Sequence, residues 1–435
     1  MRFFYLLPIV FFLCISCQNL DDVSPAERES FLRVFGGTTD YIGKVVELDT
    51  DGYIIGIDSA ENSNGGIINT SSSAVIIKTD KYGTVIWRRV IKDASVNSIK
   101  TVEGGYLIFG ESIQFSDTVQ QIDKVKSKAR LIKMDANGNI QLDKKWGDNS
   151  NDTRIDFFGS AITLRNDSII SIIGFKVPGS NQTTIVAAHN LTTLDTLWTE
   201  RYFLLDRDMI NGKAVTLTSS KDIIWASSAL SETQTSKASY LNIPVVKPHS
   251  TFTNSGRFGQ NEDAYYSGAE IKASAIGFGV VGTYSSKTNT NSNMYFVKAD
   301  PMGNIISGSE LFFDASLSKN NIALSANDKS RSETQDTGDA IAVTSDGGYL
   351  LAGSMTTTTT ADGDIGNGGK DIYLVRIDPF GTVLWNKIIG GTGDETIASV
   401  KQTKDGGFIM CGTNNLNELS SVIVVKVDKN GDFKK

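Results

Sequence analysis

Short apolar runs separated by two kinds of tight turn recur along almost the whole chain, and they constrain its fold more than any other feature. The clearest copy is DIYLVRIDPFGTVLWNKIIGGTGDETIASVKQTKDGGFIMCG at residues 371–412. It contains four runs rich in β-branched and aromatic residues, each bounded by Asp, Gly or Pro. Such runs predict four β-strands, with tight turns at residues 378–381 and 405–407.

Both halves of this unit return elsewhere in the chain. The strand–DxxG–strand half starts at residues 74, 129, 295 and 422, and a decayed copy covers residues 184–198. The strand–turn–strand half occurs seven times. Each copy ends in Gly or Ala, at residues 56, 110, 174, 226, 282, 353 and 412, and successive copies are 52 to 71 residues apart. A period of this length with four strands per unit is typical of a β-propeller. We therefore expect an all-β fold of seven four-stranded antiparallel blades.

This pattern predicts that the two ends of the chain share one blade. FLRVFGG at residues 31–37 resembles WNKIIGG at residues 385–391, whereas the last repeat lacks a full outer strand. The N-terminal strand is therefore expected to complete the last blade, which leaves no long unpaired sheet edge. Residues 31–435 are predicted to form one propeller domain.

The first 30 residues lie outside this repeat. Residues 1–16 combine the charged Arg2 with an apolar run that is too short to span a bilayer, as in a secretory signal. The sequence CISC at residues 14–17 resembles the lipobox of bacterial lipoproteins. That resemblance implies cleavage before Cys17, its acylation with chains such as palmitate, and anchoring in the outer membrane. Cleavage of an ordinary secretory signal nearby is the alternative.

Residues 17–30 are predicted to be a lipidated polar tether. The acidic pair Asp21 and Asp22 resembles the surface-export signal of some Gram-negative lipoproteins, which implies a surface-exposed domain. A solvated acidic linker is the other interpretation. The net charge of −7 argues against a nucleic-acid groove, which needs clustered Lys and Arg. Cys411, the only cysteine after residue 17, is expected to be a small buried apolar residue.

Strand alternation places the tight turns on one face of the predicted disc and the longer connections on the other. We call the second face the variable-loop face; its predicted loops are residues 59–73, 112–128, 177–182, 231–237, 285–293, 355–370 and 413–419. Binding residues concentrate on loops held by a rigid scaffold. Any binding surface is therefore expected on this face and at the central opening. A further long polar loop is predicted at residues 318–336.

Two sets of aspartates are candidate ligand-binding residues. Asp362, Asp364 and Asp371 alternate with glycines and offer hard oxygen ligands for Ca²⁺, although the same pattern also suits a polar Gly-rich loop. A second set could form a ring of carboxylates that attracts cations or basic groups, or could accept backbone N–H bonds and fix turns. Its members are Asp40, Asp152, Asp263, Asp339 and Asp394.

Other repeated residues are expected to serve the fold. The aspartates of the DxxG turns are predicted to be turn formers, and the tryptophans near the ends of outer strands are predicted to fill the spaces between blades. These residues are Asp80, Asp135, Asp300, Asp378 and Asp428, and Trp87, Trp146, Trp198 and Trp385.

Catalytic signals are weak. The two histidines, His189 and His249, have no metal-ligand spacing to another His or Cys, and no nucleophile elbow, P-loop or zinc-protease motif occurs. We therefore expect a protein that is not an enzyme and needs no organic cofactor. A glycoside hydrolase is the alternative, because its two carboxylates need proximity only in space.

The units DGGYLLAGS and DIYLVRIDPFGTVLWNKIIGG look like the propeller-repeat domains of exported Gram-negative lipoproteins and cell-surface proteins. The DxxGxxxW unit is also similar to quinoprotein-type propeller repeats, and the strands resemble bulb-type lectin repeats without their mannose motif. These resemblances imply a binding module for glycans or for extracellular or envelope proteins. A periplasm-facing scaffold of envelope protein assembly is the second interpretation.

Overall fold

Most of the described chain is β-strand in the computed structural model. The model describes residues 30–60, 72–115, 125–147, 156–176, 182–202, 209–233, 236–248, 254–259, 264–287, 291–320, 322–324, 329, 334–360, 363–416 and 419–433. These residues contain strands β1 to β28 and one short 3-10 helix, η1 (Ala315–Asn320). None of the described helices is long and apolar enough to cross a bilayer. The all-β prediction is confirmed.

Three sheets have four strands each, and every strand is antiparallel to the next in the chain. The first consists of β2 (Asp40–Leu48), β3 (Gly52–Ala60), β4 (Ser72–Asp80) and β5 (Val85–Lys92). The second consists of β6 (Ser98–Val102), β7 (Gly105–Phe115), β8 (Val125–Asp135) and β9 (Ile140–Trp146). The third consists of β10 (Asp156–Arg165), β11 (Ser168–Lys176), β12 (Thr183–Asn190) and β13 (Thr196–Tyr202).

Two further sheets have eight strands each. One contains β14 (Met209–Leu217), β15 (Ile223–Thr233), β16 (Ser236–Val246), β17 (Asn254–Phe258), β18 (Ala264–Ser274), β19 (Gly277–Ser286), β20 (Ser292–Ala299) and β21 (Leu311–Phe313). The other contains β22 (Ala340–Val343), β23 (Tyr349–Thr360), β24 (Gly363–Ile377), β25 (Val383–Ile389), β26 (Asp394–Gln402), β27 (Phe408–Leu416), β28 (Leu419–Val427) and β1 (Phe31–Phe35). Each is held together in its middle by one parallel bridge, Ser239 to Tyr265 in the first and Lys370 to Asp394 in the second.

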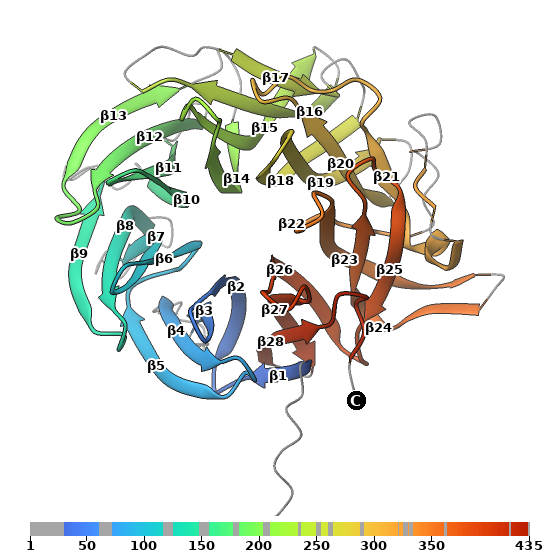
Figure 1. Cartoon of the computed structure of the whole chain (residues 1–435), viewed down its shortest axis with the longest axis horizontal. Helices are drawn as coiled ribbons and strands as arrows, with labels where there is room; N and C mark the ends of the chain where they lie inside the picture. Colours follow the sequence, from blue (N-terminus) through green and yellow to red (C-terminus); the bar gives the residue numbers. More distant parts are fainter. Residues whose placement is uncertain are drawn as a thin grey trace, which may run out of the picture.

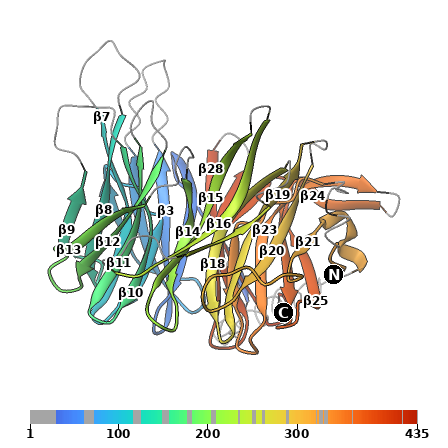
Figure 2. The same ribbon diagram turned by 90° about the horizontal axis from the view of Figure 1, so that it is seen from above.

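The sheets stand in a ring around a common axis, with the first strand of each four-strand group nearest the axis (Figure 1). Seen edge-on, the strands run across the thickness of the ring (Figure 2). β1 pairs antiparallel with β28, from Phe31 opposite Lys426 to Phe35 opposite Val422, as predicted from the chain ends. Multiple four-stranded antiparallel sheets in this arrangement are consistent with a β-propeller.

The hydrophobic core lies between neighbouring sheets rather than in one central mass. One cluster joins Ile54 of β3 to Ile108 of β7, and another joins Val46 of β2 to Ile409 of β27. Such side chains alternate along each strand with residues of the opposite face. Burial between sheets fixes the inner strands around the axis and so positions the residues that point into it.

The five turn aspartates hold the DxxG turns, as predicted. In Asp80, Oδ1 accepts hydrogen bonds from the backbone N–H groups of Tyr82 at 2.9 Å and Thr84 at 2.8 Å. Asp135, Asp300, Asp378 and Asp428 repeat this geometry. The third residue after each aspartate is a glycine with positive φ, such as 78° at Gly83, a conformation that glycine adopts without strain.

The tryptophans connect neighbouring groups of four strands, as expected. Trp87 of β5 donates its Nε1–H to Ala136 O in the next sheet at 3.1 Å. Trp385 packs edge-on against Phe408 with ring centroids 6.2 Å apart. Trp146 stacks over His189, and Trp198 packs against a buried cluster that spans two sheets. Cys411 is completely buried, as predicted, and burial raises the pKa of its thiol to about 12.

Residues 355–370 are not the loop that the sequence suggested. β23 and β24 continue past the rest of their sheet as a paired hairpin, with Thr358 opposite Ile365 (Figure 1). Met355 and Ile365 are buried in one cluster with Tyr373. Thr favours strands, and Ile365 gains apolar contacts only when the hairpin folds back, so pairing replaces an open loop.

Candidate functional site

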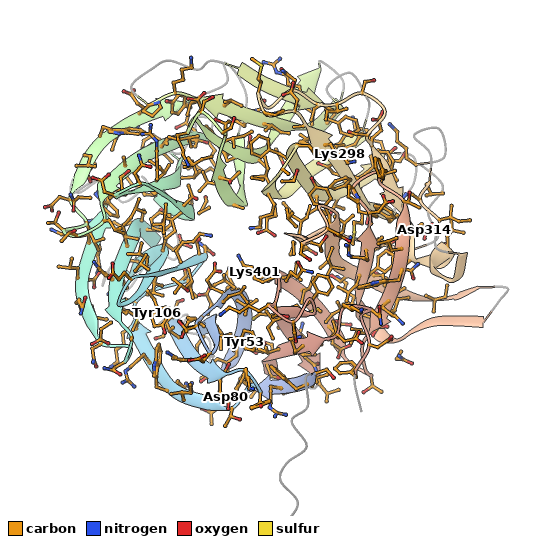
Figure 3. The ribbon with its side chains drawn as sticks, in the orientation of Figure 1. Tyr53, Asp80, Tyr106, Lys298, Asp314 and Lys401 are labelled. Carbon is orange, nitrogen blue, oxygen red and sulfur yellow. The ribbon has the colours of Figure 1, made fainter. Side chains whose placement is uncertain are left out.

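Charged residues at one repeated position face the axis. Glu47, Lys100, Lys272 and Lys401 lie on the inner strands β2, β6, β18 and β26, opposite Ile54, Leu107, Gly279 and Ile409. Each partner is two residues beyond a glycine, which opens the second strand of its group in three cases and directly precedes β27 in the fourth, so the four positions are equivalent. In Figure 3 Lys401 reaches the centre of the ring, whereas Asp80 lies near its rim.

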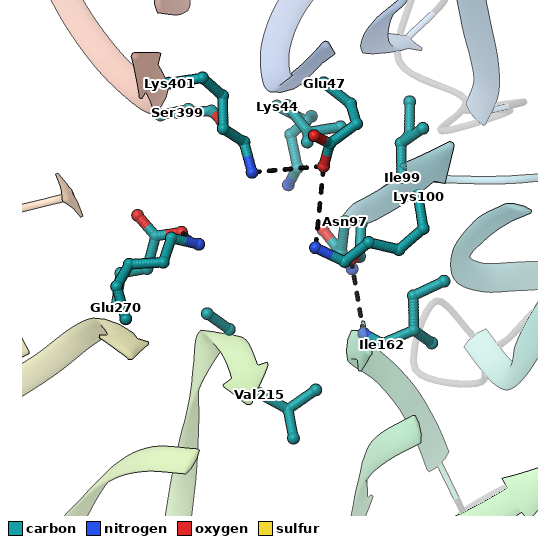
Figure 4. Close-up of a pocket in the computed structure, with 15 residues that line it drawn as sticks. Lys44, Glu47, Asn97, Ile99, Lys100, Ile162, Val215, Glu270, Ser399 and Lys401 are labelled. Atoms are coloured by element: carbon teal, nitrogen blue, oxygen red, sulfur yellow. Dashed lines mark hydrogen bonds and ion pairs between the residues drawn. The ribbon is translucent and has the colours of Figure 1, made fainter. Parts of the chain in front are cut away.

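These side chains form two sets of ion pairs, one around Glu47 and one around Glu270, and we call the five residues the axial cluster. Glu47 Oε2 lies 3.2 Å from Lys401 Nζ and 3.7 Å from Lys100 Nζ. Glu270 Oε1 lies 2.6 Å from Lys272 Nζ, and Glu270 Oε2 accepts the backbone N–H of Ile341 at 2.8 Å. Figure 4 shows Glu47, Lys100, Glu270 and Lys401 pointing into the same space from different sheets.

Burial and mutual charge shift the pKa values of the axial cluster. Burial opposes ionisation of Glu47, but Lys401 and Lys100 outweigh it and lower the pKa of Glu47 below its usual value. The pKa of Glu270 is lowered in the same way, against burial, by Lys272 and Lys401. Burial, followed by the charge of Lys401, lowers the pKa of Lys100 to about 8. Both glutamates are therefore anions at neutral pH.

The axial cluster lines a cavity of about 40 Å³, which we call the inner cavity (Figure 4). A wider cavity of about 360 Å³ adjoins it and shares Lys44, Asn97 and Ala398 with it. The wider cavity is lined by residues in the first half of the inner strands, such as Gly43 and Ser160. It therefore lies on the side of the ring where the inner strands begin, which is the predicted variable-loop face.

The structure describes three of the five aspartates in the predicted ring of loop carboxylates. Asp40 Oδ1 accepts hydrogen bonds from the backbone N–H of Ser420 at 2.9 Å and from its hydroxyl at 3.0 Å. Asp339 Oδ2 accepts the hydroxyl of Thr337 at 2.5 Å. Asp394 begins β26 against Gly369, where an added Cβ would lie 2.0 Å from Asp394 Oδ1. Asp152 and Asp263 lie outside the described residues.

Asp156 takes the place in its sheet that Asp40 has in the first sheet. Both begin an inner strand, and Asp156 Oδ1 accepts the backbone N–H of Ser127, on the third strand of the preceding sheet, at 3.1 Å. Ser420 has the same position relative to Asp40. The Gly–Asp spacing in the sequence predicts Asp152 for this place, whereas the start of the strand gives Asp156.

The structure places two of the three candidate calcium ligands, Asp364 and Asp371, at different points along the hairpin. Asp362 lies outside the described residues, and Asp364 lies opposite Thr359 near the tip of the hairpin. Asp371 lies opposite Met355 at the base of the hairpin and is completely buried. Among the described residues no group of three or more His, Cys, Asp or Glu is arranged to hold a metal ion.

Asp371 instead approaches a second buried carboxyl group, that of Glu395. Asp371 Oδ2 accepts the backbone N–H of Asn367 at 2.7 Å, and Glu395 Oε2 accepts that of Gly391 at 2.8 Å. Burial, together with the charge of Asp371, raises the pKa of Glu395. Within the described part of the chain, Asp371 Oδ1 has no hydrogen-bond partner.

The described histidine is part of the core. His189 is completely buried, its Nε2 lies 2.8 Å from Ser171 Oγ, and its ring stacks on Trp146 with centroids 4.2 Å apart. Burial lowers the pKa of His189 to about 4. It is therefore a neutral core residue at physiological pH. His249 lies outside the described residues.

The axial cluster was missed in the sequence, although a signal was present. The segments VVEL, SIKT, EIKA and SVKQ each carry a charged residue at the same point before a turn. On a strand with one face buried, a charged residue recurring at an inward-facing position indicates a shared polar space. The turns and apolar residues dominate the similarity between the repeats, and this recurring charged position does not contribute to it.

Comparisons with known proteins give fold-level similarity only. No protein-family model and no curated protein sequence matches this chain. Among solved structures, Trypanosoma rangeli sialidase aligns at 12% identity over 79% of this chain and 56% of its own, with a TM-score of 0.42. The chain thus spans little more than half of that protein.

Two other solved structures match more of their own length. Quinohemoprotein alcohol dehydrogenase from Comamonas testosteroni aligns at 10% identity over 93% of this chain and 78% of its own, with a TM-score of 0.47. The β-propeller domain of the Trilobed protease from Pyrococcus furiosus aligns at 11% identity over 92% and 98%, with a TM-score of 0.46. At these identities and scores, none of the three structures bears on activity or ligand.

Proposed function

We propose that this chain is a seven-bladed propeller that serves as a non-catalytic binding module of an outer-membrane lipoprotein, taking glycan or protein ligands on its variable-loop face. The count of seven is supported by the pairing within the two eight-stranded sheets. Each is divided by a single parallel bridge, and removing those bridges leaves seven antiparallel groups of four strands.

The two adjoining cavities at the axis are the observation that carries this proposal. A concave site with a few converging polar groups is the usual form of a ligand site. Here the cavity of about 360 Å³ lies on the variable-loop side and leads to the buried axial cluster. Burying so many charges costs free energy, and apolar residues would fill the axis at lower cost. A polar axis is therefore better explained by binding than by stability.

A hydrolase remains the minor alternative, and the electrostatics favour the binding role. A glycoside hydrolase needs one carboxylic acid whose pKa is raised so that it can donate a proton. Glu47 and Glu270 are the carboxyl groups that line the inner cavity, and lysines lower the pKa of both. Neither is suited to act as the general acid at neutral pH.

The lipid anchor and location rest on the sequence. Cys17 lies outside the described residues, and β1 begins at Phe31 after the predicted tether. Surface exposure is the first reading, and a periplasm-facing scaffold of envelope protein assembly is the alternative. Protease accessibility on intact against permeabilised cells separates them, because only a surface-exposed propeller is digested on intact cells. A Cys17→Ala variant, which should be released from the membrane fraction, tests the anchor.

The binding role is tested by screening the propeller against glycan arrays and against labelled envelope and extracellular proteins. Lys44→Ala alters the wall of both cavities, whereas Phe380→Ala removes a side chain that is 89% exposed on the tight-turn face. We expect binding to fall with Lys44→Ala and to persist with Phe380→Ala. The opposite pattern would place the binding surface on the tight-turn face and refute the assignment.

A further inference from the structure

The three lysines of the axial cluster converge from three different sheets. Lys100, Lys272 and Lys401 occupy equivalent positions on β6, β18 and β26, and all three line the inner cavity. Glu47 contacts the ammonium groups of Lys100 and Lys401, and Glu270 contacts that of Lys272. The ring geometry thus brings together three cations that are distant in the sequence.

The charges lining the inner cavity do not balance. Glu47 lies between Lys401 and Lys100, and Glu270 contacts Lys272. Three lysines therefore share two carboxylates, which leaves one positive charge in excess. Lys44, the fourth lysine of the lining, is 3.5 Å from Asp58, which lies outside the lining.

An unbalanced charge in a buried space is costly unless a partner of opposite sign is present. The pKa of Lys100 is lowered for the same two reasons: burial and the nearby positive charge of Lys401 both disfavour its ammonium form. An anion placed among the lysines would supply the missing charge. Ammonium groups are point-charge donors that suit carboxylate and phosphate oxygens.

We propose that the inner cavity binds the anionic group, a carboxylate or a phosphate, of a small ligand through Lys100, Lys272 and Lys401. This inference rests on the proposed binding function and names the chemistry of its ligand. The inner cavity of about 40 Å³ admits only a group of a few atoms. The rest of the ligand would occupy the adjoining cavity of about 360 Å³, where Lys44 and Asn97 line the passage between the two.

Isothermal titration calorimetry with sodium phosphate and with sodium succinate tests this proposal, at pH 7 and at an ionic strength held constant with sodium chloride. We expect saturable binding of at least one probe to the wild-type protein. Lys100→Met should weaken it at least tenfold. The probe that binds more tightly identifies the phosphate or the carboxylate as the preferred group.

Two further variants make the test specific. Lys144→Met removes a lysine that is 44% exposed on β9 and should bind like the wild type. Lys272→Met removes a second cavity lysine and should also lose affinity, so the proposal stays testable if one cavity variant fails to fold. Absence of saturable binding to the wild type, or equal weakening by Lys144→Met, would overturn the proposal.

Failure of the anion site and failure of the binding module give different results. A negative titration with a positive ligand screen would remove the anion site and leave the binding module. A positive titration in which the screen finds no glycan or protein ligand would support the anion site and count against a glycan or protein partner.

Discussion

Lys401 Nζ lies 3.2 Å from Glu47 Oε2, and this contact joins β26 to β2 across 354 residues of sequence. Glu47 also lies 3.7 Å from Lys100 Nζ on β6. One carboxylate therefore connects three neighbouring sheets at the axis, where the last sheet of the chain meets the first two. Because the groups are buried, the arrangement of partners matters more than the strength of any one pair.

Removing Glu47 should be strongly destabilising. Glu47→Gln leaves Lys401 and Lys100 facing each other without an anion, and losing one partner of a buried ion pair costs about 3 kcal/mol. Adding Lys401→Met should recover part of the loss, which a double-mutant cycle in urea would measure. Lys387→Met, in the exposed pair with Asp432, should cost less than about 1 kcal/mol. Similar losses in the buried and exposed pairs would contradict this account.

His189 should make the protein less stable in mild acid. Its folded pKa of about 4 lies below the ordinary 6.5, so the unfolded chain takes up the proton first as the pH falls. The contribution is complete above about pH 6.5 and is lost as the pH falls toward 4. The loss at pH 5 is about 2 kcal/mol by linkage.

Urea unfolding at pH 7 and pH 5 measures this contribution. His189→Gln can keep a hydrogen bond to Ser171 and does not titrate, so it should reduce the difference between the two pH values. An unchanged pH difference in His189→Gln would assign the acid sensitivity to carboxyl groups instead.

The aspartate of each DxxG turn should be replaceable by asparagine but not by alanine. Asp80→Ala removes the acceptor of two backbone N–H groups and should cost about 1 kcal/mol. Asp80→Asn keeps an oxygen in the same place and should cost less. Thermal unfolding of the two variants decides the point, and equal losses would mean that the charge rather than the geometry is important.

The fold was largely predictable from the sequence because its signals are local. The turn at Asp80 needs only the aspartate, the next few N–H groups and Gly83, and the same few residues recur in each copy. Strand identity follows from apolar runs between such turns. Even the pairing of β1 with β28 could be predicted, because the N-terminal segment resembles an outer strand that the last repeat lacks.

The candidate site was harder to predict because its residues meet only through the ring. Lys100, Lys272 and Lys401 belong to three sheets, and no local pattern says that they share a cavity. The sequence predicts a loop at residues 355–370 because glycines and polar residues interrupt the apolar alternation that marks a strand. Burial of Ile365 against a neighbouring cluster is a tertiary effect that overrides the local composition.

The carboxyl pair at the base of this hairpin gives a direct test of cation binding. If no cation is bound, Asp371→Asn removes the charge that raises the pKa of Glu395 and should stabilise the protein at pH 7 by about 1 kcal/mol. The gain should shrink as the pH falls through the raised pKa of Glu395, because the wild type takes up a proton there. Thermal unfolding with EDTA and with calcium chloride provides the control. Stabilisation of the wild type alone by calcium would instead indicate a cation between the two groups.

The side chains on the buried face of β1 should contribute to stability, and those on its exposed face should not. Phe31 is 6% exposed, and its ring lies 6.2 Å from that of Tyr53 in the next sheet, whereas Leu32 on the opposite face is 44% exposed. Phe31→Ala should cost about 3 kcal/mol, and Leu32→Ala less than about 0.5 kcal/mol. Deleting residues 31–35 would also leave the backbone groups of β28 unpaired at an open edge, so that variant should aggregate. Urea unfolding and light scattering measure both effects, and a monomeric deletion variant of wild-type stability would show that β1 is dispensable.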